Sequence, residues 1–293
     1  MTRNLSLPSR IFDTMNVVFL IFVSLITLLP FLYVIAASLA SSEEVTQKPF
    51  LLIPSKLDFT AYKYIFSTSS ISRSLLVSVM ITIVGTFTNL LMTSLMAYPL
   101  ARKDLSYRRG VLFLVTFSMI FSGGMIPTFL VVKAVGMMDS YMSLIIPGAI
   151  SAFYLIVLKN FFQQLPEGLE ESAKIDGCND FQIYYKIILP LSKPALATLT
   201  LFYAVGHWNS YFSAILYIND AAKWPIQVLL RQIVILSQGG FGDSTQFGES
   251  FVVPPAVTIK MAVIVVSMLP ILCVYPFLQK HFAKGLYLGS VKG

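Results

Sequence analysis

Charged residues are scarce in this chain. Asp, Glu, Lys and Arg make up 12% of its 293 residues, whereas 56% are hydrophobic, and the mean hydropathy is +0.76. Soluble globular domains carry about 25% charged residues. The composition therefore excludes an ordinary soluble domain and predicts a polytopic membrane protein.

Side chains that carry chemistry are also few. The two histidines, His207 and His281, have no carboxylate beside them in sequence, and the two cysteines, Cys178 and Cys273, fall in different environments. A disulfide is therefore not expected, no CxxC pair or histidine cluster predicts a metal site, and no nucleophile system has support. The phosphate-binding pattern G-x-x-x-x-G-K-[ST] is absent too, so any ATP hydrolysis would have to reside on another chain.

The net charge of +7 could suggest nucleic-acid binding. No basic helix with interleaved aromatic residues is present, however. In a membrane protein, a net positive charge is more simply explained by cytoplasmic loops rich in Lys and Arg.

Six apolar stretches predict six spans in a single transmembrane domain covering residues 1–293. They lie at about 17–39, 75–98, 111–132, 142–158, 195–218 and 257–277. The first corresponds to roughly 35 Å of helix at ~1.5 Å per residue. Ser38 and Ala40 could form a signal-peptidase site, but the apolar run exceeds the ~7–15 residues of a signal peptide, and we expect an uncleaved span. Gly123, Gly124 and Pro127 predict a kinked or partly unwound third span.

The loop after the second span fixes the predicted orientation. It is short and contains Arg102, Lys103, Arg108 and Arg109, and basic loops remain in the cytoplasm. Both termini and a tail at 280–293 are then cytoplasmic, whereas 41–72 and 220–255 are external. Within the second external segment, 225–236 predicts a short amphipathic helix, and the glycines at 239, 240 and 242 predict a flexible continuation.

The polar segment 165–194 predicts two short helices separated by a turn. Pro166 and the acids that follow it, including Glu170 and Glu171, favour a helix start, because acidic side chains stabilise the positive end of the helix dipole. Gly177 favours the end of that helix, since glycine adopts the left-handed conformation readily.

The second helix of this segment has its own start and stop signals. Asn179 or Asp180 can cap its first turn, and Pro190 and Pro194 are expected to end it. On its own, such an amphipathic pair could be a cytoplasmic loop that packs on its own membrane domain.

The residues of this segment resemble the EAA loop of ABC importer permeases. Their order and spacing are similar to that family over Glu171-Ser172-Ala173, Asp176-Gly177, Tyr184, Ile187 and Leu189-Pro190. Ser172 and Cys178 stand where the family usually has Ala. The resemblance implies a coupling helix that docks in a cleft of a separate ATP-hydrolysing subunit, with Glu171, Ser172, Ala173, Asp176 and Gly177 as the coupling residues.

The resemblance extends over essentially the whole chain. The stretches 279–286 and 289–293 are similar to the C-terminus of the maltose-type permease. The stretches 123–127 and 206–211 are more similar to the branch that serves complex or acidic oligosaccharides such as alginate or rhamnogalacturonan fragments. The chain is thus identified as a carbohydrate-uptake ABC importer permease.

This resemblance implies an all-α membrane protein with the type I importer permease fold, in the cytoplasmic (inner) membrane of a bacterium. The implied partners are a second homologous permease, two ATPase subunits, an extracytoplasmic solute-binding protein, an oligosaccharide and membrane lipid, with no nucleic acid. No catalytic residue and no cofactor are implied on this chain, because ATP and magnesium would bind the partner ATPase.

The fifth span has the most polar interior and supplies candidates for the substrate path. Tyr203, His207 and Tyr211 share a face at i, i+4 and i+8, with Asn209 nearby. Asn89 in the second span is a weaker candidate. Polar side chains at mid-membrane are costly unless they line water or contact other helices. Two interpretations therefore remain open: contact with a sugar, or hydrogen bonds that join the two permeases.

Three other functions have to be weighed against an importer of a complex or acidic oligosaccharide. The first is a permease for a neutral malto-type or other oligosaccharide. The second is an ion-coupled secondary transporter, which usually has buried acids in its spans, and none of the six predicted spans contains one. The third is a scaffold or receptor that only recruits a cytoplasmic partner, which the polar fifth span disfavours.

Overall fold

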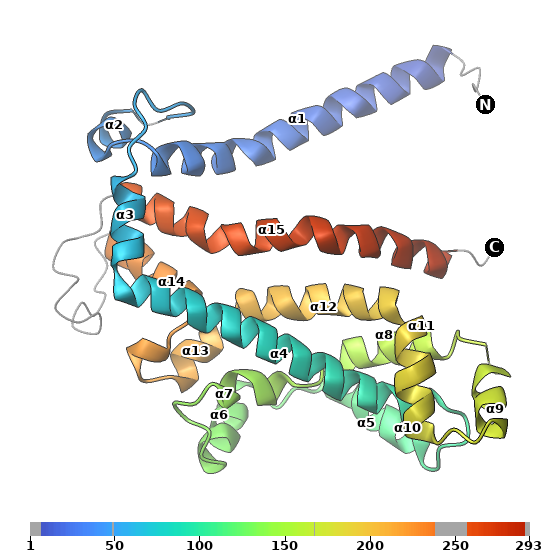
Figure 1. Cartoon of the computed structure of the whole chain (residues 1–293). Coiled ribbons are helices and arrows are strands. Elements are labelled where there is room, and N and C mark those ends of the chain that lie inside the picture. The colour runs from blue at the N-terminus through green and yellow to red at the C-terminus, as the bar shows by residue number, and fades with distance from the viewer. Residues whose placement is uncertain (1–6, 49, 167, 238–256, 291–293) are drawn as a thin grey trace. The chain divides into compact units, whose positions relative to one another are not determined.

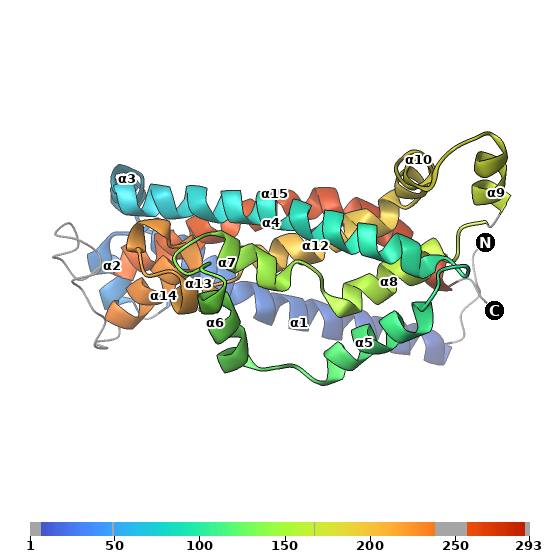
Figure 2. The same cartoon turned by 90° about the horizontal axis from the view of Figure 1, so that it is seen from below.

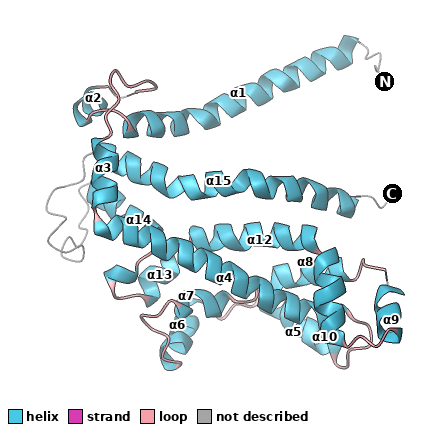
Figure 3. Ribbon diagram, in the orientation of Figure 1, coloured by secondary structure: helices cyan, strands magenta, loops and turns pink. Residues whose placement is uncertain are grey.

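The computed structural model describes residues 7–48, 50–166, 168–237 and 257–290. Within these ranges every regular element is a helix, and no strand is present (Figure 3). The chain divides into two compact units. The first comprises Met1–Ser69 and Leu230–Met268, and the second comprises Ser70–Leu229 and Leu269–Gly293.

The first unit begins with α1 (Leu7–Ser38), whose apolar side chains are almost all exposed. It continues with the short helices α2 (Ser42–Gln47) and α3 (Thr60–Ser67). Parts of α14 (Ile226–Ser237) and α15 (Val257–Ser290) complete it. Its small core contains Ala37, Ala40, Val45 and Leu51, with Tyr33 and Met261 against it.

The second unit is built on α4 (Ser69–Ala101), the long second span. After it along the chain come α5 (Arg108–Ile120), α6 (Met125–Ala134), α7 (Met142–Ile145), η1 (Ile146–Gly148) and α8 (Ala152–Phe162). The chain then forms α9 (Gly168–Ile175), α10 (Asp180–Ile183), η2 (Tyr184–Ile188), α11 (Leu189–Leu191), α12 (Lys193–Trp208), α13 (Phe212–Tyr217) and η3 (Ala221–Lys223). Figures 1 and 2 show α9 and α10 at one end of α4, and α6, α7 and α13 toward the other.

The helices account for six candidate spans in the described residues. Three are continuous: Ser9–Ser38, Ser69–Ala101 and Val257–Val274. Three more are helix pairs, each bent at a short break: α5 with α6 by 117°, the α7–η1 segment with α8 by 53°, and the α10–α11 segment with α12 by 80°. If each bent pair crosses the membrane once, the described helices give six spans, the number predicted from the sequence. The boundaries of the single transmembrane domain stay a prediction.

The break in the third span lies at the predicted glycines. Gly124 has φ 85° and ψ 175°, a backbone conformation that is essentially restricted to glycine. Pro127 lies in the first turn of α6, where its missing N–H removes no helical hydrogen bond. The predicted kink is therefore confirmed.

Two predicted helix ends were wrong. The second helix of the polar segment does not stop at Pro190, because the turn before it widens to a π-helix in which the Leu189 amide bonds to Tyr184 O. The helix thus continues to Leu191. The fifth span, expected to run unbroken from 195 to 218, ends at Trp208 and resumes at Phe212, so its polar residues 209–211 form a break.

Asp139 joins two loops at the end of the second unit that carries α6 and α13. Its carboxylate accepts the backbone N–H groups of Asn219 and Asp220 and lies 3.0 Å from Lys223 Nζ. The Asp220 N–H and the Lys223 ammonium lower the pKa of Asp139. The helix predicted at 225–236 is present as α14, whereas the glycine-bearing stretch after it lies outside the described residues.

Candidate functional site

The first helix of the polar segment, α9, has the start and stop predicted for it. Glu170 and Glu171 lie in its first turn. At its end the Cys178 amide donates to Ala173 O at 2.9 Å, and the Gly177 amide donates to Lys174 O at 3.0 Å. This pair of bonds is the Schellman ending, which requires a left-handed residue, and Gly177 has φ +81°.

The second helix begins with the capping box made by Asn179. Its side chain accepts the Gln182 amide at 2.8 Å, and the Gln182 side chain accepts the Asn179 amide at 3.0 Å. The two caps fix both sides of the turn at Gly177 and Cys178. The segment is therefore an elbow of two helices with defined ends rather than a flexible loop; we call residues 168–191 the elbow.

The five predicted coupling residues do not all face the same way. Glu171, Ser172, Asp176 and Gly177 are exposed, whereas Ala173 is 6% exposed and belongs to an apolar cluster of the chain itself. The small side chain of Ala173 thus lets α9 pack closely against the rest of its own chain. Glu171 and Ser172 are exposed on α9, and Asp176 and Gly177 are exposed in the turn that follows it.

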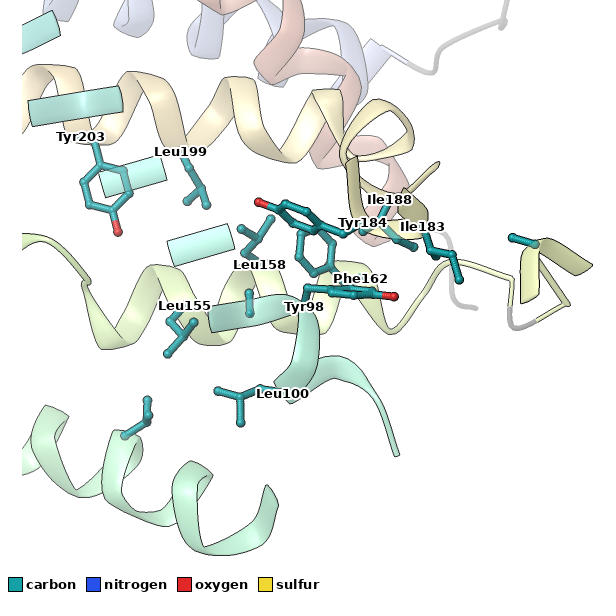
Figure 4. Close-up of a cluster of buried hydrophobic side chains, with 13 residues drawn as sticks. Tyr98, Leu100, Leu155, Leu158, Phe162, Ile183, Tyr184, Ile188, Leu199 and Tyr203 are labelled. Atoms are coloured by element: carbon teal, nitrogen blue, oxygen red, sulfur yellow. The ribbon is translucent and has the colours of Figure 1, made fainter. Parts of the chain in front are cut away.

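An apolar cluster attaches the elbow to three spans. Ile183, Tyr184 and Ile188 of the elbow meet Tyr98 and Leu100 of α4, Leu155, Leu158 and Phe162 of α8, and Leu199 and Tyr203 of α12 (Figure 4). The cluster therefore makes the elbow and the ends of these spans one packed body.

Tyr184 adds a directional contact to this cluster. Its ring lies 5.5 Å from that of Tyr98, and its hydroxyl lies 2.7 Å from Ser94 Oγ on α4. Both oxygens of this hydrogen bond are buried. The aromatic residue of the EAA-like pattern thus fixes the rotation of the π-helical turn against α4.

Arg102, just beyond α4, links the basic loop to the elbow. Its guanidinium bonds both oxygens of Asp104, at 3.0 and 2.6 Å, and also pairs with Asp180, the first residue of α10. Its side chain is only 16% exposed. The Arg102 hydrogen bonds lower the pKa of Asp104 from 3.8 to about 2, and the two carboxylates raise the pKa of Arg102.

Glu170 lies on the inner side of α9, beside this ion-pair group. It lines a hollow of about 270 Å³ together with Arg102, Asp104 and Lys174. Burial raises its pKa. Because the charged form is disfavoured there, this carboxyl is poorly suited to a surface ion pair, unlike its exposed neighbour Glu171.

Three of the predicted substrate-path residues, Asn89, Tyr203 and His207, take part in hydrogen bonds between α4 and α12. His207 Nε2 lies 3.1 Å from Asn89 Oδ1, and the Tyr203 hydroxyl lies 2.7 Å from Thr93 Oγ1. Asn89 and Thr93 belong to α4, and His207 and Tyr203 to α12. These hydrogen bonds join two spans of the same chain.

The other two path residues lie at the break between α12 and α13. Asn209 is exposed and caps the end of α12, and Tyr211 is 41% exposed. The structure therefore separates the predicted set into a group with buried Asn89 and Tyr203 and half-buried His207, and an exposed group with Asn209 and Tyr211.

Sequence reasoning missed several residues of these sites. Arg102 was noticed only as a basic residue of the loop, and Asp180 only as a possible cap. Gly85 was not noticed at all, although a Cβ added there would lie 2.5 Å from His207 Nε2. The signal that could have found Gly85 is its place with Asn89 and Thr93 in an i, i+4, i+8 series on α4.

Comparison with known proteins decides the family. A family model described as "Binding-protein-dependent transport system inner membrane component" matches residues 6–286. The chain belongs to this family. It is therefore a multi-pass inner-membrane permease subunit of an ABC transporter and not an enzyme, since a separate ATPase hydrolyses ATP.

Individual relatives cover nearly the whole chain. The "Polygalacturonan/rhamnogalacturonan transport system permease protein YtcP" of Bacillus subtilis (strain 168) is 61% identical over 98% of this chain and 100% of its own length. "Protein LplC" of the same organism is 57% identical over 97% of this chain and 96% of its own length.

A solved structure shows the same fold. One chain of a bacterial ABC transporter "involved in the import of the acidic polysaccharide alginate" superposes with a TM-score of 0.87 at 34% identity, over 96% of this permease and 100% of that chain. The predicted all-α importer permease fold is confirmed, and the ion-coupled transporter considered from the sequence is excluded.

The Gly177 turn gives the first prediction. Gly177→Pro cannot adopt φ +81°, because proline fixes φ near −65°. We expect the assembled importer carrying it to lose transport-coupled, vanadate-sensitive ATPase activity while the subunit still inserts. Gly177→Asn is the matched control, since Asn tolerates the left-handed region, and it should retain most activity. Equal activity in the two variants would contradict a role for this turn.

The Arg102 ion pairs give the second prediction. Arg102→Ala should reduce uptake per ATP hydrolysed, because α10 loses its link to α4, whereas Arg109→Ala removes the same charge from an exposed site nearby and should not. Arg102→Lys should rescue only in part, since ammonium cannot bond a carboxylate in two places.

The effect of Arg102→Ala on uptake per ATP hydrolysed should not depend on pH between 5.5 and 8. The folded pKa of Asp104 is lowered to about 2, so its stabilising ion pair is complete above its ordinary value of 3.8 and is lost only as pH falls toward 2. Uptake and ATPase rates measured across this range test the point. A strong pH dependence of the Arg102→Ala defect would rule out the Arg102–Asp104 ion pair as a contributor to it.

Proposed function

We propose that this chain is one of the two permeases of an ABC importer for acidic oligosaccharides, of the kind released from galacturonan and rhamnogalacturonan. The observation that carries the proposal is the 61% identity, over nearly the full length of both chains, to a permease named for polygalacturonan and rhamnogalacturonan transport. Similarity to a chain of an alginate importer supports the acidic class at lower identity. Alginate itself is the less favoured member of that class.

In the proposed assembly a second homologous permease completes the membrane path. Two ATPase subunits bind ATP and magnesium, and a solute-binding protein delivers the oligosaccharide from outside. The basic loop around Arg102 supports a cytoplasmic position for the elbow and for both termini.

The exposed surface of α9 is the proposed contact with the ATPase. Glu171, Ser172, Asp176 and Gly177 would enter its cleft, and Ala173 would hold α9 against the chain's own apolar cluster. Because Ile183, Tyr184 and Ile188 join that cluster to α4, α8 and α12, a displacement of α9 would be passed to three spans together. The elbow thus converts closure of the ATPases into movement of the membrane helices.

Asn209 and Tyr211 are the proposed substrate contacts. They lie at an exposed break in the fifth span, and such a break is tolerated in a membrane where the backbone lines a water-filled path. A tyrosine ring offers an apolar face for a sugar ring, and an amide can bond its hydroxyl groups.

The substrate class can be tested on the purified importer with its binding protein. We expect short galacturonan and rhamnogalacturonan oligosaccharides to raise its ATPase rate and maltotriose to leave it at the basal level. Alginate oligosaccharides serve as the second acidic probe. Stimulation by maltotriose alone would instead favour the neutral-oligosaccharide alternative.

The substrate contacts can be tested by the affinity of uptake. Tyr211→Ala should raise KM about tenfold, as expected for the loss of an aromatic contact worth about 1–1.5 kcal/mol. Phe212→Ala, which removes an exposed neighbouring ring, is the matched control and should change KM little. An unchanged KM in Tyr211→Ala would remove this residue from the path.

A further inference from the structure

The fourth span is interrupted within the second unit. η1 ends at Gly148 and α8 begins at Ala152, with a bend of 53° between the two segments. At such a break the last carbonyl groups of one helix and the first amides of the next lose their helical partners. Within a membrane these groups are costly to leave unpaired, because no water is available to bind them.

Two side chains from other spans supply the missing partners. Asn89 of α4 donates its Nδ2–H to Gly148 O at 2.8 Å, before the break. The Ser151 amide, after the break, donates to the Tyr203 hydroxyl of α12 at 3.3 Å. Asn89 is 2% exposed and Tyr203 5% exposed. The break is thus closed on one side by α4 and on the other by α12.

The same two helices are locked to each other at this level. Since Asn89 Nδ2 is the donor to Gly148, its Oδ1 is left as the acceptor for His207 Nε2–H. The His207 ring also fills the space over Gly85, where any Cβ would collide with it. Tyr203 meets Thr93 one turn away.

The register of these contacts is regular. Gly85, Asn89 and Thr93 follow one another at four-residue intervals on α4, as Tyr203 and His207 do on α12. Small and hydroxyl residues at such intervals let helices approach closely in a membrane. The residues on α4 thus pair with those on α12 in antiparallel order, and the break of the fourth span is bonded to both helices.

We propose that Asn89, Tyr203 and His207 are positioning residues that clamp the break in the fourth span to α4 and α12, and that this clamp controls the rate of the transport cycle rather than the affinity for substrate. Both ends of the Asn89 amide are already bonded, and the Tyr203 hydroxyl already has two partners. A sugar could bind these groups only by breaking the clamp.

The clamp is placed where it can receive movement from the elbow. Tyr203 belongs both to the clamp and to the apolar cluster that holds the elbow, as Tyr98 of α4 and Leu199 of α12 belong to that cluster. Asn89 and His207 lie about two turns further along the same helices. The proposal rests on the chain being an ABC importer permease and not on the identity of the sugar.

Amide exchange in the assembled importer, reconstituted in lipid nanodiscs, tests the clamp without any substrate. Tyr203→Phe removes a single oxygen atom, and we expect exchange at Ser151 to rise roughly tenfold, as for the loss of one interhelical hydrogen bond and its cooperative partner. Thr86→Val is the matched control, since the Thr86 hydroxyl is buried on α4 without a hydrogen-bond partner among the described residues. Unchanged exchange in Tyr203→Phe would overturn the clamp.

Changing the side-chain volume at Gly85 and His207 provides a second, independent test of the contact between α4 and α12. Gly85→Ala should collide with His207 and lower the vanadate-sensitive ATPase rate, and Gly85→Ala combined with His207→Ala should recover it in part because the space is restored. No recovery in the double variant would show that α4 and α12 do not meet as proposed.

Uptake kinetics distinguish the clamp from a binding site. Asn89→Leu and Tyr203→Phe should lower kcat several-fold with KM changed less than about twofold, since they alter the cycle and not the contact with substrate. A raised KM with unchanged kcat would instead assign these residues to the substrate path. If no oligosaccharide tested is transported, the substrate assignment fails, whereas the exchange result at Ser151 still decides the clamp.

Discussion

Backbone N–H and C=O groups inside a membrane must find partners within the protein, and this constraint decides where the spans of this permease can break. The third span breaks at Gly124, in a conformation essentially restricted to glycine. The fourth breaks where Asn89 and Tyr203 reach its free backbone groups. At Pro190 the missing N–H is accommodated by a π-turn. Each of these three departures from a straight helix thus has a specific local cause.

Packing and paired polar groups also explain why the elbow is firmly attached to the spans. Its polar outer face is exposed on α9, and its inner face contributes Ile183, Tyr184 and Ile188 to the apolar cluster of α4, α8 and α12. Arg102 adds ion pairs at the edge of that cluster. A body held by packing, a buried hydrogen bond and ion pairs moves as a unit, because packed interiors transmit displacement with little deformation.

Local signals let the sequence predict much of the elbow. The acids at the start of α9, the glycine at its end and the Asn179 cap act within a few residues, and each is where it was expected. Family resemblance supplied the fold, which the comparisons confirm. The continuation through Pro190 was missed, because a proline is normally a stop signal and the compensating π-turn depends on how Tyr184 is held by α4.

The buried polar group was harder to interpret for a different reason. The shared face of Tyr203 and His207 could be derived from helical spacing, but the partners of these side chains lie more than a hundred residues away in sequence, on α4. A sequence alone does not show whether a polar residue in a span is bonded to its own chain, to a second permease or to substrate. The pairing of Arg102 with Asp180 was hidden in the same way.

The central claim is that the elbow moves with its spans as a rigid lever driven by the ATPase. Spin labels at Ser172 on α9 and Ser106 after α4, both exposed, would report it in a C178S/C273S background of the assembled importer. We predict that the distance between these labels is the same without nucleotide and after vanadate trapping, while Ser172→Cys cross-links to the ATPase. A change in that distance, or the absence of any cross-link, would contradict the account.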